Sequence, residues 1–82
     1  MPQSLQRLGW SPNHLTRRHR ECLHWMAKGL LAKEIADKMG IHVGTVWKHR
    51  AMIMSHYGVN EALPAVIKAL KAGHIKLEEI NL

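Results

Sequence analysis

The chain has 82 residues, of which 46% are hydrophobic and 22% charged, and its formal net charge is +6. This length allows one domain with a single core and is too short for two. The composition excludes a disordered chain, the single cysteine excludes an internal disulfide, and no apolar run approaches the roughly 18 residues of a membrane span. We therefore expect one folded cytoplasmic domain that needs no cofactor.

Positive charge is concentrated in the first part of the chain. Residues 7–50 carry nine basic and three acidic side chains, whereas residues 51–82 carry three of each. A basic region beside a neutral one is typical of a polyanion-binding face next to a packing surface. A solvated basic surface that serves solubility explains the charge equally well, so charge alone leaves both interpretations open.

The first predicted elements are an arm and a helix. Residues 1–14 combine glycine and proline with no sustained helical period, which indicates an arm. A helix follows to about Lys28, with Thr16 as its N-cap and Gly29 as its stop. The apolar positions that share its inner face are Leu15, Cys22, Leu23, Met26 and Ala27, so Cys22 is expected to fill the core.

Three further helices follow at helical spacing. The second covers residues 31–39 and ends at Gly40, and the third covers residues 43–56 and ends at Tyr57-Gly58. In the third helix we expect Val46 and Ile53 to point inward with Met52 or His49, while Trp47, Lys48 and Arg50 point elsewhere. The fourth runs from an N-cap at Asn60 to about Ala72, and the pattern after Gly73 is too irregular for a prediction. The domain therefore spans residues 15–75, and residues 76–82 form a tail.

The spacing of small residues between the second and third helices predicts a helix-turn-helix. Ala36 is followed four residues later by Gly40 and six further on by Val46. Ala36 lets the helices approach, Gly40 makes the tight turn, and Val46 anchors the third helix across the second at a steep angle. The outer face of the third helix is then free to enter a groove of duplex DNA.

The side chains on and near this outer face divide by what they can contact. Donors, small residues and an aromatic plane suit base edges and thymine methyl groups, and the candidates are Trp47, Lys48, Ala51 and Val43. Residues that can reach phosphates position the protein without reading sequence, and the candidates are Thr45, Lys33, His49, Arg50 and His42.

A series of short motifs resembles the C-terminal DNA-binding domain of the LuxR/FixJ family of bacterial transcription regulators. The motifs are Leu15-Thr16-x-Arg18, Ala27-x-Gly29, Lys33-Glu34-Ile35-Ala36, Gly44-Thr45-Val46-x-Lys48-His49, Gly58-Val59, Ala65-Val66 and Gly73-His74-Ile75. The resemblance implies an all-α, four-helix domain whose third helix reads the major groove and whose fourth helix pairs in a dimer on a two-fold site. It places Trp47, Lys48 and Ala51 at base-contacting positions and Thr45, Lys33 and His49 at backbone contacts.

Several residues depart from the family's pattern. His19 stands where the family usually has Glu, so we expect the capping box with Thr16 to be lost, and His42 replaces a Ser-type cap. Leu31-Ala32 replaces a Ser-Asn pair, and Ala62 stands where Arg is common.

Trp47 takes a position that is normally Lys or Arg. Indole donates one hydrogen bond and cannot make a bidentate contact to guanine, so we expect a different target sequence, with Trp47 on a thymine methyl or on a protein partner.

The usual family member also carries an N-terminal receiver or ligand-binding domain, for which these 82 residues have no room. The chain is therefore expected to be a stand-alone reader of DNA or an excised domain. Leu63, Ile67 and Leu70 share a face of the fourth helix, which favours a homodimer, although the same stripe also suits the domain's own core.

The sequence gives the least support to an enzyme or a metal-binding protein. The chain has one Asp, no paired carboxylates beyond Glu78-Glu79 and no glycine-rich phosphate loop. The seven histidines include no pair at i,i+4 spacing, so no metal site is expected. The alternative to a DNA-binding regulator is an interaction protein of phage or plasmid type, which would bind a host regulator or RNA polymerase through its fourth helix.

Overall fold

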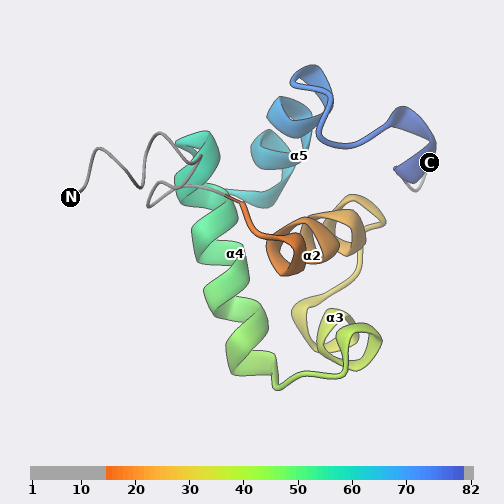
Figure 1. Ribbon diagram of the computed structural model, residues 1–82, viewed down its shortest axis with the longest axis vertical. Helices are drawn as coiled ribbons and strands as arrows, with labels where there is room; N and C mark the ends of the chain where they lie inside the picture. The colour runs from red at the N-terminus through yellow and green to blue at the C-terminus, as the bar shows by residue number, and fades with distance from the viewer. Residues whose placement is uncertain (1–14, 81–82) are drawn as a thin grey trace.

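The computed structural model describes residues 15–80, which form four α-helices and one short 3-10 helix (Figure 1). The elements are α2 (Arg17–Ala27), α3 (Ala32–Met39), α4 (Val43–Tyr57), α5 (Ala62–Lys71) and η1 (Leu77–Glu79). No strand occurs within this range, and the all-α, four-helix prediction is confirmed. The predicted arm, residues 1–14, lies outside the described residues. None of the described helices is long and apolar enough to cross a membrane.

The longest helix, α4, organises the others around itself. It runs along one side of the molecule, with α3 beside its first turns and α5 beside its last, and it packs against α2, α3 and α5 (Figure 1). Its inner side chains Val46 and Ile53 are completely buried, as expected. Met52 and His49 are only half-buried, so neither joins them in the core.

The core is built from the apolar faces of all four helices. The residues buried in it are Leu15, Cys22, Leu23, Met26, Ala27, Ala32, Ile35, Ala36, Met39, Val46, Ile53, Ala65, Val66, Ala69 and Ile75. Removing a Leu or Ile side chain from water contributes about 1.5–3 kcal/mol, so these residues supply the main driving force for folding. Cys22 lies among them as expected, and burial raises the pKa of its thiol to about 11, which keeps the sulfur neutral.

The turn between α3 and α4 depends on Gly40. Its backbone takes φ +66°, in the left-handed region, and its N–H donates to the carbonyls of Ala36 and Asp37 at the end of α3. Ile41 N–H also donates to the Ala36 carbonyl at 3.0 Å. These bonds satisfy the last carbonyls of α3 and reverse the chain within a few residues, as a helix-turn-helix requires.

The helix caps correct two of the expectations from the sequence. The capping box of α2 is present, because His19 Nδ1 accepts from Thr16 N–H at 3.1 Å and Thr16 Oγ1 accepts from His19 N–H at 3.2 Å. An unprotonated imidazole nitrogen is an acceptor, so His19 replaces the Glu that this motif usually needs. At α5 the prediction of Asn60 as N-cap is wrong: Glu61 takes that position and makes no side-chain cap hydrogen bond.

Candidate nucleic-acid interface

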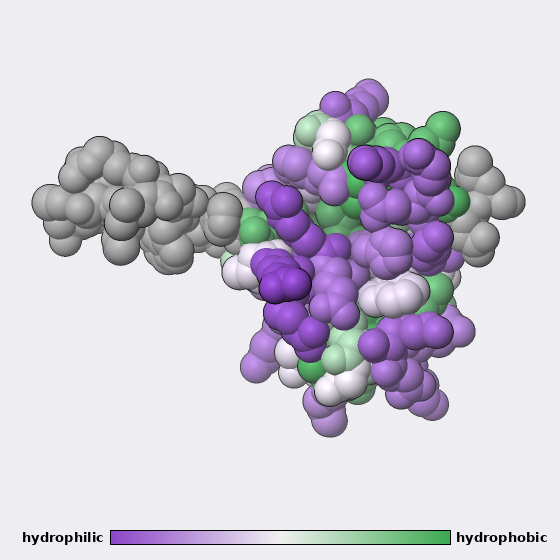
Figure 2. Space-filling model, turned by 45° about the vertical axis from the view of Figure 1, so that its right-hand side comes forward, coloured by the Kyte–Doolittle hydropathy of each residue, from purple (hydrophilic) through white to green (hydrophobic). Residues whose placement is uncertain are grey.

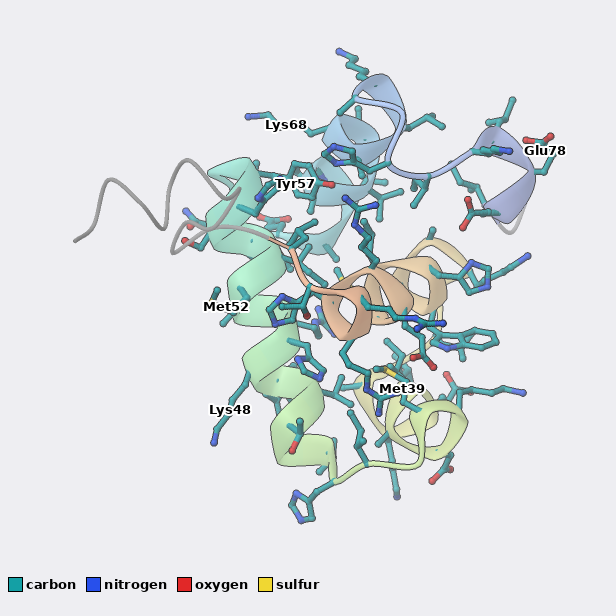
Figure 3. The ribbon with its side chains drawn as sticks, viewed as in Figure 1. Met39, Lys48, Met52, Tyr57, Lys68 and Glu78 are labelled. Carbon is teal, nitrogen blue, oxygen red and sulfur yellow. The ribbon has the colours of Figure 1, made fainter. Side chains whose placement is uncertain are left out.

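The outer face of α4 is exposed along much of its length. Trp47, Lys48 and Ala51 are exposed, and 55% of the Trp47 surface is open to solvent. Lys48 and Met52 project from the side of α4 that faces away from the other helices (Figure 3). Val43 is half-buried and packs against the core, so it presents less surface than the other three candidates for base contact.

The first turn of α4 is held by the side chain of its N-cap residue. His42 is exposed, and its Nδ1 accepts from Gly44 N–H at 2.9 Å. A Cβ added at Gly44 would lie 3.1 Å from that same nitrogen, so this cap fits best against glycine. His42 thus replaces the Ser-type cap in function, while Thr45 follows half-buried in the first turn.

Beside α4, a histidine of α2 contacts a histidine of α4. The rings of His19 and His49 meet edge to face with centroids 5.0 Å apart. Burial, with a smaller contribution from the charge of Arg18, lowers the pKa of His49 below the ordinary histidine value. In the free domain the imidazole of His49 is therefore shifted toward its neutral form.

Arg18 ties α2 to the end of α3. Its guanidinium forms an ion pair with Glu21 at 2.9 Å and donates to the carbonyl of Met39 at 3.2 Å. Met39 is the last residue of α3, so this bond holds the beginning of the turn into α4. A cation at a helix C-terminus also interacts favourably with the helix dipole.

Two further predicted contact residues come from different helices. Lys33 is exposed in the first turn of α3. Arg50 is half-buried on α4, and its guanidinium carbon lies 5.1 Å from the centroid of the Trp47 ring. That distance is within the range of a cation–π contact.

Helix α5, the fourth of the predicted helices, carries exposed apolar residues. Leu63 is 68% exposed and Ile67 43%, while Leu70 is half-buried and packs against the core. Figure 2 shows a largely hydrophilic face, with hydrophobic residues gathered toward the upper end, the level at which Figure 1 places α5. Lys68 Nζ donates to the carbonyl of Tyr57 at 3.1 Å and so joins α5 to the last turn of α4.

Comparison with known families identifies this arrangement. The sequence profile described as "Bacterial regulatory proteins, luxR family" matches residues 13–69, which include α2 to α4 and most of α5. The chain belongs to the luxR family. The predicted resemblance is thereby confirmed, and so is the expectation that the chain is not an enzyme, because LuxR-family proteins of this description are regulators.

Curated relatives agree with this assignment. The transcriptional regulatory protein DesR of Bacillus subtilis (strain 168) is 32% identical over 75 residues, covering 92% of this chain and 38% of that protein. The transcriptional activator protein AnoR of Acinetobacter nosocomialis is 37% identical over 60 residues, covering 73% and 25%. The transcriptional regulatory protein UhpA of Escherichia coli (strain K12) is 41% identical over 46 residues, covering 56% and 24%. The matched part of the chain thus spans 24–38% of these relatives. No solved structure matches the chain.

Sequence reasoning did not assign a role to two LuxR-domain residues that support α4. Arg18 was noted only as part of a motif, and His19 only as a departure from the family's pattern. The spacing Thr16-x-x-His19 did carry a signal for the cap, because it places an acceptor three residues after the N-cap. The contacts of Arg18 with Met39 and of His19 with His49 join elements separated in sequence, which a local pattern does not reveal.

Proposed function

We propose that this chain binds double-stranded DNA by inserting α4 into the major groove, and that it regulates transcription in the bacterial cytoplasm. The observation that carries the proposal is a LuxR-family helix-turn-helix whose α4 buries Val46 and Ile53 on one face and leaves Trp47, Lys48 and Ala51 exposed on the other. A major groove about 12 Å wide admits such a helix.

Within this proposal the residues have two roles. Base contacts come from exposed side chains on α4 and from the residue at its start: Trp47, Lys48, Ala51 and Val43. Backbone contacts come from other residues of α4, from its N-cap and from α3: Thr45, Lys33, His49, Arg50 and His42. The backbone contacts set the position and orientation on the duplex, and the base contacts supply the specificity.

We also propose that the DNA-bound form is a homodimer paired through α5. Support comes from the exposure of Leu63 and Ile67 on one side of a short helix, with Leu70 beside them. Large exposed apolar groups on a small domain are favourable places for association, since pairing removes them from water. Two-fold pairing would present two copies of α4 to two half-sites.

The first test is selection of bound duplexes from a random library at two salt concentrations. We expect enrichment of a palindromic site, together with weaker binding at higher salt because phosphate contacts release counterions. Binding without enrichment would contradict sequence-specific regulation, and no binding at low salt would contradict the DNA-binding function altogether.

A second function is favoured by the same apolar side of α5. With 68% of Leu63 exposed, α5 offers a surface for a host regulator or RNA polymerase. On this alternative the chain forms a heterodimer without relying on its own affinity for DNA. The alternative is favoured if this protein binds no duplex but forms a stable complex with a purified regulator or polymerase.

A further inference from the structure

We propose that Trp47 and Arg50 form one recognition unit, in which the indole contacts the 5-methyl group of a thymine and Arg50 positions the indole. The inference rests on the proposed DNA-binding function of α4 and adds the base feature that α4 selects. It also gives Arg50 a role in specificity, beyond any contact with phosphate.

The chemistry of the indole limits what it can recognise in the major groove. Indole has one N–H donor and no acceptor, and its remaining surface is apolar. Base edges in the major groove present donors and acceptors, and the thymine methyl is their one apolar group. A Trp47 side chain that is 55% exposed on this face therefore matches thymine better than any other base.

The position of Arg50 indicates how the indole is held. Its guanidinium carbon lies 5.1 Å from the centroid of the Trp47 ring, one turn further along the same helix. Within residues 15–80 this guanidinium makes no hydrogen bond or ion pair, so the ring is the partner that orients it. Stacking restricts the rotamers of both side chains before DNA binds and lowers the entropy lost on binding.

The neighbouring residues leave the indole accessible on the outer face of α4. Ala51 is exposed one turn beyond Trp47 and carries only a methyl group, while Lys48 is exposed beside Trp47. Ala51 extends the apolar surface, whereas Lys48 supplies a separate cation. The two kinds of contact are carried by different side chains, so they can be separated by substitution.

The test replaces single thymines by deoxyuridine in the duplex selected from the random library. This exchange removes the methyl group and keeps every hydrogen-bonding atom of the base. Binding constants are measured for the unmodified protein and for W47K, R50K and K48A, each checked for native helicity by circular dichroism. The readout is the ratio of affinities for the thymine and uracil duplexes at each position.

We expect the unmodified protein to lose about fourfold in affinity at one position of each half-site, equivalent to the roughly 0.8 kcal/mol of one buried methyl group. W47K should bind the thymine and uracil duplexes with equal affinity. R50K keeps the charge but not the planar group that stacks, so it should reduce the ratio as well. K48A serves as the matched control: it should weaken binding overall and preserve the ratio.

Two results would overturn the inference. In the first, no thymine-to-uracil exchange changes the affinity, or W47K keeps the same ratio of affinities as the unmodified protein. Either outcome removes Trp47 from methyl recognition while leaving DNA binding intact. A ratio that R50K leaves unchanged removes the positioning role of Arg50. Failure to bind any duplex is a different result, because it overturns the proposed function itself and this inference with it.

Discussion

His19 does two things at once in this domain. Its Nδ1 closes the capping box at the start of α2, and its ring packs edge-on against His49 of α4. The usual Glu at this position can make the cap but offers no ring to α4. His19 therefore replaces a charged cap with a cap whose ring also packs against α4.

We expect His19→Ala to destabilise the domain by about 1 kcal/mol, because the Thr16 N–H loses its acceptor and α4 loses a packing contact. His19→Glu should recover the part due to the cap, since the carboxylate accepts the same hydrogen bond. Urea unfolding followed by circular dichroism measures both variants. A His19→Ala midpoint equal to that of the unmodified protein would show that the cap contributes nothing.

Lys48 is the exposed cation among the proposed base contacts. Lys48→Ala should cost about 1–3 kcal/mol on the selected site if the ammonium group reads a base, with relaxed preference at one position. A contact to phosphate would instead weaken binding uniformly across sequences and lower the salt dependence. Binding to the selected site and to single-base variants distinguishes these outcomes, and unchanged binding to every duplex would remove Lys48 from the proposed interface.

At the level of elements, the turn between α3 and α4 depends on one glycine in the left-handed region. Gly40 has φ +66°, and a Cβ added there would meet nothing within 4 Å. The cost of another residue at this position is thus conformational rather than steric. We expect Gly40→Ala to destabilise the domain by about 1 kcal/mol, the order of the penalty for an L-residue in the left-handed region.

Differential scanning calorimetry of Gly40→Ala provides the measurement. The matched control is Ala51→Gly, which places a glycine within an exposed helical position and should cost about as much through helix propensity. A Gly40→Ala variant as stable as the unmodified protein would mean that the turn changes its backbone to accommodate the new residue.

The sequence predicted the elements well because their signals are local. Apolar periodicity located the buried faces of α2 and α3, and Gly40 and Gly58 marked helix ends whose residues do adopt left-handed φ. The error at Asn60 arose because capping propensity favours Asn over Glu, whereas α5 has Glu61 as its N-cap and begins at Ala62. The contact between Trp47 and Arg50 depends on side-chain rotamers, which periodicity does not specify.

For the whole molecule, two histidines make stability depend on pH. Burial first, and nearby arginines second, lower the pKa of His49 and His74 below the ordinary value of 6.5. The groups that face His49 are His19, Arg18 and Glu21, and those near His74 are Tyr57, His56 and Arg20. The unfolded chain thus binds these protons more readily than the folded one.

Stability should therefore be complete above about pH 6.5 and fall as the pH drops through the lowered values. The hydrogen bond from His24 also lowers the pKa of Glu79, which adds a second loss below the ordinary Glu value of 4.5. Thermal unfolding at a series of pH values tests this, and His49→Asn should flatten the upper part of the curve. A domain that gains stability on acidification from pH 7 would contradict the assignment.

The proposed dimer is also a property of the whole molecule. Leu63→Lys places a charge on the apolar side of α5, so the protein should sediment as a monomer and lose affinity for the palindromic site. Leu77→Lys is a matched control, because Leu77 is also largely exposed, at 59%, but lies on η1. Equal sedimentation of both variants and the unmodified protein would contradict pairing through α5.

The bond from Lys68 to the carbonyl of Tyr57 has a consequence for the spacing of the DNA site. Because α5 packs against α4 and this bond adds a link between them, a pair formed through α5 would hold its two α4 helices at one fixed separation. Half-sites must then lie at one spacing along the duplex. Inserting about half a helical turn between them would carry the second half-site to the opposite side of the DNA, out of reach of the second α4.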